Sequence, residues 1–545
     1  MSKILFYFWA LFILFVEIVF PQITQKQKIT YLWPTDASKF LTSSFCEYRG
    51  RRFHTGIDIK TWGKTGYNVY AVRPGYVWRI SVSPFGYGKA LYLKLDTGEI
   101  AVYAHLSGFV PYIQERVEEE QKRIGRYRIN KYFKPSEIPV AQGEIVAFTG
   151  QTGIGAPHLH FEIRDARNRP LNPLLKNYKL PDRVKPVITA ISFTPLGINS
   201  EVNHDYKPYL VKPHRIKEGE YALPELVQIW GKVGVAVACY DKQLNIRHRI
   251  GVYSLRLFVD NKLKFQYQFD KVSFQKNSMI DWERDYRLAR RGLGLFYKLY
   301  KEPYNTLNYY VPNQPWAGVL QTSLMDSLPG LQNKRQQSIG STSFRASTDY
   351  LLPGYHDLRI EITDFFDNLT ILRGKIVVGA PFHLYPIFSK EDSVNHRIEN
   401  IVTDNIAGVN DIEVSYYAKN KWNLLAVNLA NFIEKGGNDT SVPFEKLTGN
   451  LPLENYPVLK FIGKDPFGAP SYPLIYVDKN KLRANSPDPR IELALDFYDD
   501  YVRMEISSNV ILRDQPQLFF ISDSTDTIKI RCFQRELKQF IGKLD

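Results

Sequence analysis

The sequence contains few cysteines, the residues that form disulfide bonds and thiolate metal sites. Its 545 residues include only three cysteines, Cys46, Cys239 and Cys532. They are odd in number, far apart and without Cys-x-x-Cys spacing, which argues against a disulfide scaffold and a cysteine-based zinc site. The sequence also shows no repeat at a fixed period, so a repeat architecture is not predicted.

The sequence also lacks clusters of basic residues. Lysine and arginine outnumber aspartate and glutamate by 71 to 56, a net charge of +15. The basic residues are scattered among acidic ones, and no nucleic-acid-binding module is recognisable. The balance favours work near an anionic surface or polymer, and we expect no nucleic-acid partner.

A long hydrophobic run is also lacking at the N-terminus. Lys3 precedes an apolar run over 4–16 that Glu17 breaks and Pro21 ends. The run is too short for a comfortable membrane span and fits the apolar region of a secretory signal. We therefore predict a signal peptide over 1–22 and export to the periplasm or cell envelope. An Ala-x-Ala cleavage site is missing, which leaves an uncleaved membrane anchor as the alternative.

Aromatic residues, by contrast, are abundant, with 35 tyrosines and 33 phenylalanines. Together with many short stretches of alternating polarity, they predict a mainly β protein. Pro181 and Pro186 bracket an expected linker. The predicted domains are 30–185, rich in short strands; 187–380, an antiparallel Ig-like β-sandwich; and 381–545, a β-rich C-terminal domain of unknown role.

Two segments of the first domain have distinct patterns. "KALYLKLDTGEIAVYAHLSGF" predicts a hairpin with its turn at Asp96-Thr97-Gly98. The segment 112–133 is highly charged and is predicted to be helical. It is interpreted either as a solvated face or, because it directly follows His105, as a lid or groove wall.

Four of the ten histidines fall between positions 54 and 160. They occur in "HTGID", "YAHL" and "HLHFEIR". In a strand, residues two apart share a face, so Leu159, Phe161 and Ile163 would face a core. The two histidines and the glutamate of the same stretch would then share the opposite face.

These residues match the needs of a catalytic zinc ion, which takes three nitrogen or oxygen ligands and leaves a position open. His54, Asp58 and either His158 or His160 would supply that number. Two histidines would remain to accept a proton and stabilise an oxyanion. The alternatives are a solvated polar strand face, a core histidine at His105 and a chance His-x-x-x-Asp pair.

The three segments resemble those of the LytM/lysostaphin-type zinc metalloendopeptidases. The similarity extends to "SSFCEYRGRRFHTGIDI", "GYNVYAVRPGYVWRI", "GYGKALYLKLDTGEIAVYAHL" and "AQGEIVAFTGQTGIGAPHLHFEIRDARNRPLNPLL". It covers about 40–175. The resemblance implies that 30–185 is an antiparallel β metallopeptidase domain in which 112–133 is an insertion.

The resemblance also assigns roles to individual residues. It implies zinc (Zn²⁺) ligands His54, Asp58 and His160, with His105 and His158 as catalytic residues beside the bound water. Three departures from the family pattern are Cys46 in place of glycine, the absence of a serine before His-x-His, and the 112–133 insertion. None of them removes a ligand.

Glu162 has two interpretations. It would either orient a ligating histidine from behind or lie at the surface as a plain carboxylate.

The resemblance implies hydrolysis of peptide bonds in peptidoglycan stem or cross-link peptides by a zinc-activated water. We expect envelope proteins as further partners through the C-terminal β domains. The alternatives are an exported non-catalytic regulator of other wall hydrolases and an adhesion protein.

Overall fold

The structure is a computed structural model in which strands predominate. About 48% of residues lie in strands and 8% in helices, which confirms the prediction of a mainly β fold. Among the described residues, no helix is long and apolar enough to cross a membrane. The predicted signal peptide over 1–22 lies outside the described residues. These are 30–197, 199–322, 350–388, 398–405, 408–425, 442–443, 447, 456–478, 489–497, 501–512, 515–521 and 527–544.

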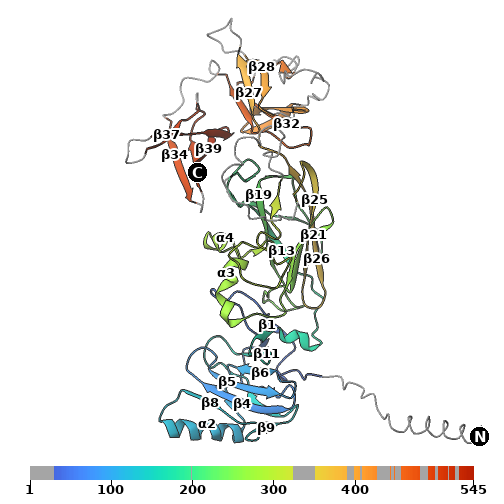
Figure 1. The fold of residues 1–545 in the computed structure, drawn as a ribbon, viewed down its shortest axis with the longest axis vertical. Coiled ribbons are helices and arrows are strands. Elements are labelled where there is room, and N and C mark those ends of the chain that lie inside the picture. Colours follow the sequence, from blue (N-terminus) through green and yellow to red (C-terminus); the bar gives the residue numbers. More distant parts are fainter. Residues whose placement is uncertain are drawn as a thin grey trace, which may run out of the picture. The chain divides into compact units, whose positions relative to one another are not determined.

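The described chain forms two compact units. The first comprises residues up to 45 and 55–181, and the second comprises 46–54 and 182–545. The larger sheet of the first unit has nine strands, in the order β1-β2-β11-β6-β5-β4-β8, with β12 paired to β11 and β9 to β4 (Figure 1). A smaller sheet has the order β3-β10-β7. The strands are β1 Leu41–Ser43, β2 Ile57–Lys60, β3 Asn68–Tyr70, β4 Gly75–Val82, β5 Lys89–Leu95, β6 Ile100–Ala104, β7 Gly108–Phe109, β8 Ile129–Tyr132, β9 Pro139–Val140, β10 Ile145–Phe148, β11 His158–Arg164 and β12 Pro170–Leu171.

Strand β11 lies in the interior of the larger sheet, between β2 and β6. It pairs antiparallel with both, so that His160 lies opposite Asp58 on β2 and Ala104 on β6. Leu159, Phe161 and Ile163 are fully buried, as their alternation predicts. The predicted hairpin is confirmed, because β5 and β6 pair antiparallel across the turn at residues 96–98. These pairings fix the polar positions of β11 against two neighbouring strands.

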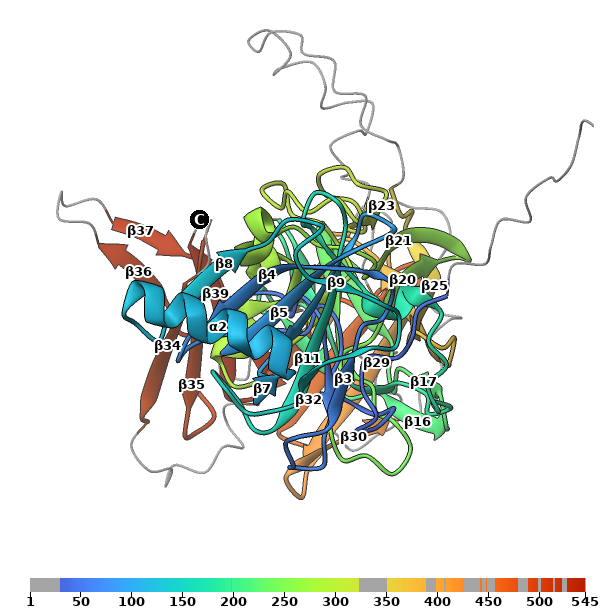
Figure 2. The ribbon, with the colours of Figure 1, turned by 90° about the horizontal axis from the view of Figure 1, so that it is seen from below.

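The charged segment 112–133 is only partly helical. Helix α2, Pro111–Ile124, buries Ile113 and Val117. It ends at Gly125, whose φ of 66° is left-handed and favours glycine. The chain then forms β8, which corrects the prediction of a helix to 133. β8 pairs with β4 at the sheet edge farthest from β1, and α2 lies at the same end of the unit (Figures 1 and 2). This placement favours the solvated face over a lid.

The second unit begins with two large sheets. One has the order β15-β13-β19-β22, with β24 on β19; the other has the order β14-β18-β26-β25-β20-β21-β23. The hydroxyl of Thr370 on β26 donates to the carbonyl of Pro186, 2.6 Å away, just before β13. The elements are β13 Val187–Pro195, β14 Glu201–Val202, β15 Tyr209–Val211, β16 His214–Lys217, β17 Glu220–Ala222, β18 Val227–Trp230, β19 Lys232–Tyr240, β20 Ser254–Val259, β21 Lys262–Gln268, α3 Ile280–Glu283, α4 Tyr286–Arg290, β22 Tyr297–Lys298, β23 Tyr310–Val311, β24 Leu320–Gln321, β25 Gly354–Thr363 and β26 Leu369–Val378.

The strand directions correct one expectation for this region. Strands β17 and β18 both pair in parallel with β26, so the region 187–380 is not purely antiparallel. β17 and β18 pair with the edge of β26 that does not pair with β25. They come from a part of the chain far from β26, so no tight hairpin turn requires an antiparallel direction. The Ig-like topology stays a prediction.

Three hairpin loops share one local structure. Each begins with an aspartate, in "DARNR", "DFFDN" and "DPFGA", starting at Asp165, Asp364 and Asp465. One carboxylate oxygen accepts the backbone N–H groups two and four residues later, at 2.8–2.9 Å in all three loops. The fourth residue has a positive φ, as Gly468 does at 87°. Such aspartates replace backbone partners at tight turns and end strand pairs sharply.

The C-terminal region forms four smaller sheets. Their orders are β27-β28-β31, β30-β29-β32-β33, β34-β35-β39-β38 and β36-β37. The first two share a core that includes Phe382, Val414 and Phe461. The strands are β27 Leu384–Phe388, β28 Ile398–Thr403, β29 Asp411–Ala418, β30 Lys421–Leu425, β31 Val442–Pro443, β32 Val458–Lys464, β33 Leu474–Val477, β34 Ile491–Phe497, β35 Val502–Ser508, β36 Leu518–Ile521, β37 Thr527–Ile530, β38 Cys532–Glu536 and β39 Gln539–Leu544.

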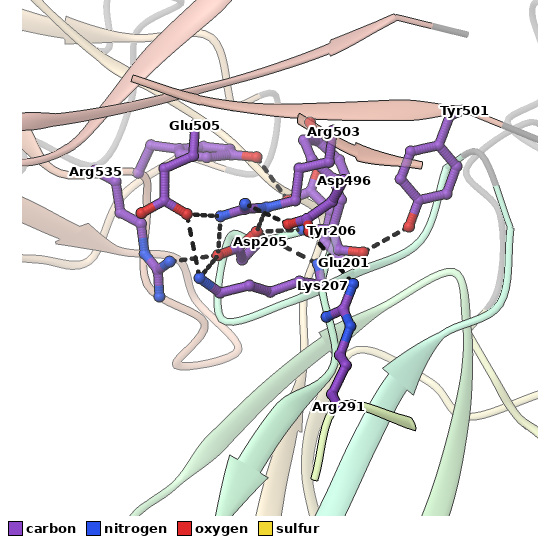
Figure 3. Close-up of polar contacts among 11 residues, drawn as sticks. Glu201, Asp205, Tyr206, Lys207, Arg291, Asp496, Tyr501, Arg503, Glu505 and Arg535 are labelled. Atoms are coloured by element: carbon purple, nitrogen blue, oxygen red, sulfur yellow. Dashed lines mark hydrogen bonds and ion pairs between the residues drawn. The ribbon is translucent and has the colours of Figure 1, made fainter. Parts of the chain in front are cut away.

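A charged network within the second unit surrounds Asp205, in the loop after β14 (Figure 3). Arg503 of β35 holds both Asp205 oxygens, with Nε and Nη2 at 2.6 and 3.0 Å. Arg535 of β38 donates to the same carboxylate, and Arg503 also reaches Glu505 at 2.7 Å. Arg503 and Asp205 are 1% and 3% exposed as side chains. The network joins the C-terminal sheet to the β14–β15 loop by charge.

Candidate metal centre

Strands β2 and β11, with the residues just before β2, bring three predicted ligands together. His54, Asp58 and His160 each offer one nitrogen or oxygen atom, and these atoms lie within 4.8 Å of one another. All three side chains are buried, at 4–6% exposure. Two imidazoles and one carboxylate match the ligand chemistry of a catalytic zinc ion.

His160 lies between two carboxylates. Its Nδ1 is 2.9 Å from Asp58 Oδ1, and its Nε2 is 2.8 Å from Glu162 Oε1. Burial alone would lower the pKa of His160, but these hydrogen bonds and charges raise the pKa to about 9. The pocket therefore favours a positive charge beside Asp58. In the structure, a proton on Nδ1 of His160 supplies that charge at the place where a metal cation would bind. The residues fit a bound zinc ion.

Glu162 is the centre of a buried hydrogen-bond network. The side chain is fully buried, so it is not a plain surface carboxylate. Its Oε1 accepts from the hydroxyls of Thr55, at 2.9 Å, and Tyr87, and Arg164 Nε donates to Oε2 at 2.6 Å. Burial opposes ionisation, but Arg164 and His160 hold the pKa of this carboxyl well below its usual range. An ionised Glu162 accepts Nε2–H of His160 and leaves Nδ1 facing Asp58.

His105 and His158 lie together next to His160. Their ring centroids are 4.5 Å apart, and His105 is 5.8 Å from His160. Nδ1 of His105 is 2.9 Å from the carbonyl oxygen of Thr152, and Nδ1 of His158 is 2.6 Å from that of Ala156. A carbonyl only accepts, so both rings carry their hydrogen on Nδ1 and keep Nε2 as the basic atom.

The two rings differ in setting. Burial, reinforced by His158 and His160, lowers the pKa of His105 to about 4, so that ring is neutral near pH 7. His105 also has a φ of 60°, in the left-handed region. Nε2 of His158 is 3.6 Å from Asp58 Oδ1. The unprotonated Nε2 of His105, beside the ligand cluster, can accept a proton from an attacking nucleophile.

The supporting residues were not predicted from the sequence. The sequence pattern could have pointed to Arg164, since this residue continues the every-second-residue series of His158, His160 and Glu162 along β11. Thr55 and Tyr87 had none, because hydroxyl residues in such settings are common. Gly56 is a close-approach position: a Cβ there would lie 2.4 Å from the carbonyl oxygen of Phe161 and 2.8 Å from Glu162 Cγ.

Comparison with known proteins relates the chain to peptidases. No family model matches it. Over 124 residues, 23% of the chain, it is 31% identical to the DD-carboxypeptidase/endopeptidase Mpg of Neisseria meningitidis, and it spans 22% of that protein's length.

Solved structures with similar regions also include peptidases. A zinc-containing peptidase from Vibrio cholerae is 25% identical, with 27% of this chain and 40% of that chain covered and a TM-score of 0.20. The catalytic domain of the M23 protein EnpA from Enterococcus faecalis is 23% identical, with 26% and 82% covered and a TM-score of 0.16.

Proposed function

We propose that the chain is a zinc-dependent endopeptidase that hydrolyses peptide bonds in the stem or cross-link peptides of peptidoglycan. The observation that carries this proposal is the convergence of His54, Asp58 and His160 within 4.8 Å. The adjacent pair His105 and His158 supplies basic nitrogens beside that cluster. Ligands and proton acceptors of the types that metal-assisted peptide hydrolysis needs therefore lie in one place.

Each residue has a separate task in the proposed reaction. His54, Asp58 and His160 would hold zinc, which supplies a Lewis acid that polarises the scissile carbonyl and makes water a better nucleophile. His105, neutral and anchored through Nδ1, accepts a proton at Nε2. That proton would pass from His105 to the leaving amine, and His158, in its protonated form, would stabilise the negative charge on the former carbonyl oxygen.

Peptidoglycan is proposed as the substrate on two grounds. The curated relative is a DD-carboxypeptidase/endopeptidase. The chain's net charge of +15 also suits an anionic envelope polymer. We further propose that the chain acts outside the cytoplasm and that the second unit binds the wall or envelope partners.

The test combines metal analysis with digestion of purified peptidoglycan. The full chain should contain one zinc ion by mass spectrometry and release peptide fragments, and a chelator should stop the release until zinc is restored. His160→Ala should lose both zinc and digestion. His105→Ala should keep zinc and lose digestion, which separates a ligand from a proton acceptor.

A matched control is His214→Ala, because His214 is exposed on β16 of the second unit. This variant should keep full zinc content and full digestion. A chain that purifies without zinc after growth in zinc, or whose digestion survives His160→Ala, would refute the proposal.

A further inference from the structure

Three aspartates form a second acidic cluster, wholly within the second unit. Carboxylate oxygens of Asp182, Asp241 and Asp364 lie within 4.8 Å of one another. The three come from different segments: Asp182 precedes β13, Asp241 follows β19 and Asp364 follows β25. They meet because the start of β13 is paired with the end of β19, with Val187 opposite Tyr240.

The cluster is buried and holds no compensating positive charge. Asp241 and Asp364 are 2% and 3% exposed, and Asp182 is half-buried. In the part of the chain that the structure describes, none of the three forms an ion pair with lysine, arginine or histidine. Two buried carboxylates and one half-buried carboxylate without a cationic partner carry a desolvation and repulsion cost.

Hydrogen bonds satisfy two members of the cluster and leave one oxygen of the third without a partner. Asp364 accepts from Phe366 N, Asn368 N and Asn368 Nδ2, at 2.6–2.9 Å, and Asp182 accepts from Val184 N at 3.0 Å. Asp241 Oδ1 is buried and has no hydrogen-bond partner. Burial, with the negative charges of Asp364 and Asp182, raises the pKa of Asp241 to about 9. A buried oxygen without a hydrogen-bond partner, on a carboxylate that lies within 4.8 Å of two others, fits a missing cation.

We propose that Asp182, Asp241 and Asp364 bind a calcium ion that fastens the segment entering the second unit to the ends of β19 and β25. This site is independent of the proposed peptidase chemistry.

The ligand chemistry favours calcium over other metals. The cluster offers oxygen only, whereas zinc sites in proteins favour imidazole and thiolate. Calcium accepts six to eight oxygens at roughly 2.3–2.6 Å, including carboxylates, carbonyls and waters in irregular geometry. Two ligands of one such ion can therefore be separated by nearly 5 Å. Magnesium demands a tighter octahedron and keeps most of its waters, so it should bind more weakly here.

The test titrates calcium chloride into the full chain, preloaded with zinc and freed of calcium on a chelating resin. Calorimetry should show one site, and Tm should rise by about 5 °C at saturation. Magnesium chloride should produce a smaller rise. Asp241→Asn should abolish binding and the calcium-dependent rise, yet raise Tm without calcium, because asparagine is neutral and is buried without taking up a proton.

The matched control is Asp367→Asn. It lies in the same loop as Asp364 but is exposed, and its left-handed φ of 64° suits asparagine. This variant should bind calcium as the parent does. If Asp241→Asn fails to fold, Asp182→Asn, at the half-buried position, replaces it with the same expected loss. No binding up to 10 mM calcium, or undiminished binding by the aspartate-cluster variants, would overturn the proposal.

Discussion

At the scale of single residues, the candidate metal centre depends on one carboxylate that is not among the proposed ligands. Glu162 accepts from four groups and presents an ionised oxygen to His160 Nε2. The buried charge of Arg164 balances it. This arrangement fixes the ring of His160 and directs its other nitrogen toward Asp58 before any cation arrives.

Replacing Glu162 by glutamine tests this role. Glu162→Gln leaves the ligands in place but replaces an ionised acceptor with a neutral amide, so zinc affinity should fall about 10- to 100-fold. Competition with a calibrated chelator measures the change. Glu118→Gln, on the exposed face of α2, should leave the affinity unchanged. Equal affinities for the two variants would contradict the role.

A second residue-scale prediction concerns acid sensitivity. Burial, with the charge of His383, lowers the pKa of His204 to about 3. Between about pH 6.5 and pH 3 the unfolded chain binds a proton that the folded chain does not, so stability falls as the pH drops. The loss approaches about 1.4 kcal/mol per pH unit at most.

His204→Asn removes this titration, and asparagine tolerates the left-handed φ of 58° at this position. Urea unfolding at pH 7.5, 6 and 5 should give a shallower loss of stability for this variant than for the parent. The exposed His214→Asn is the control and should keep the parental slope. Parallel slopes for all three proteins would contradict the prediction.

At the scale of elements, the β2–β11 pairing requires glycine at position 56. A Cβ there would meet the Phe161 carbonyl and the side chain of Glu162. Gly56→Ala should cost about 1–3 kcal/mol in unfolding free energy and reduce zinc content, because the strands must separate. Gly108→Ala on β7 is the control, since nothing lies within 4 Å of its added Cβ. Equal effects at both positions would contradict the close-approach argument.

The aspartate-headed hairpin loops make a second prediction at this scale. Asp465 is 5% exposed and accepts the N–H groups of Phe467 and Ala469. Asp465→Ala leaves both donors without an acceptor and should cost about 1–3 kcal/mol in unfolding free energy. Asp465→Asn keeps the accepting oxygen and should cost less than half as much. Equal losses would show that the loop does not depend on this acceptor.

Much of the fold and site could be predicted from sequence, and the gaps have physical causes. Alternation along "HLHFEIR" predicts one core face, but the opposite face is buried as well, which depends on partners far along the chain. Gly125 is a helix-ending signal in the sequence, but the charged pattern of 112–133 led to the prediction of a helix beyond it. Thr55 and Tyr87 had no signal, because their roles depend on tertiary proximity to Glu162. Parallel pairing of β18 with β26 likewise leaves no local pattern.

At the scale of the whole molecule, the Asp205 network should make a large contribution to stability that a single substitution can test. Asp205→Ala leaves the nearly fully buried Arg503 without its bidentate partner. Breaking such a pair should cost about 3–5 kcal/mol. Thermal unfolding measured by calorimetry should occur at a lower Tm than in the parent. Limited proteolysis should also release the C-terminal sheet sooner than it does from the parent. Asp496→Ala is the milder control, because Asp496 is 31% exposed and meets Arg503 through one atom at 3.2 Å. Equal cost would contradict the dominance of Asp205.

The same network gives the C-terminal sheet an attachment made of charge. An apolar interface holds, or tightens, as salt is added, whereas ion pairs at the partly exposed margin, such as Lys207 with Glu505, are screened within about 10 Å at 0.1 M salt. The C-terminal sheet should therefore be held against the β14–β15 loop less firmly as salt is added.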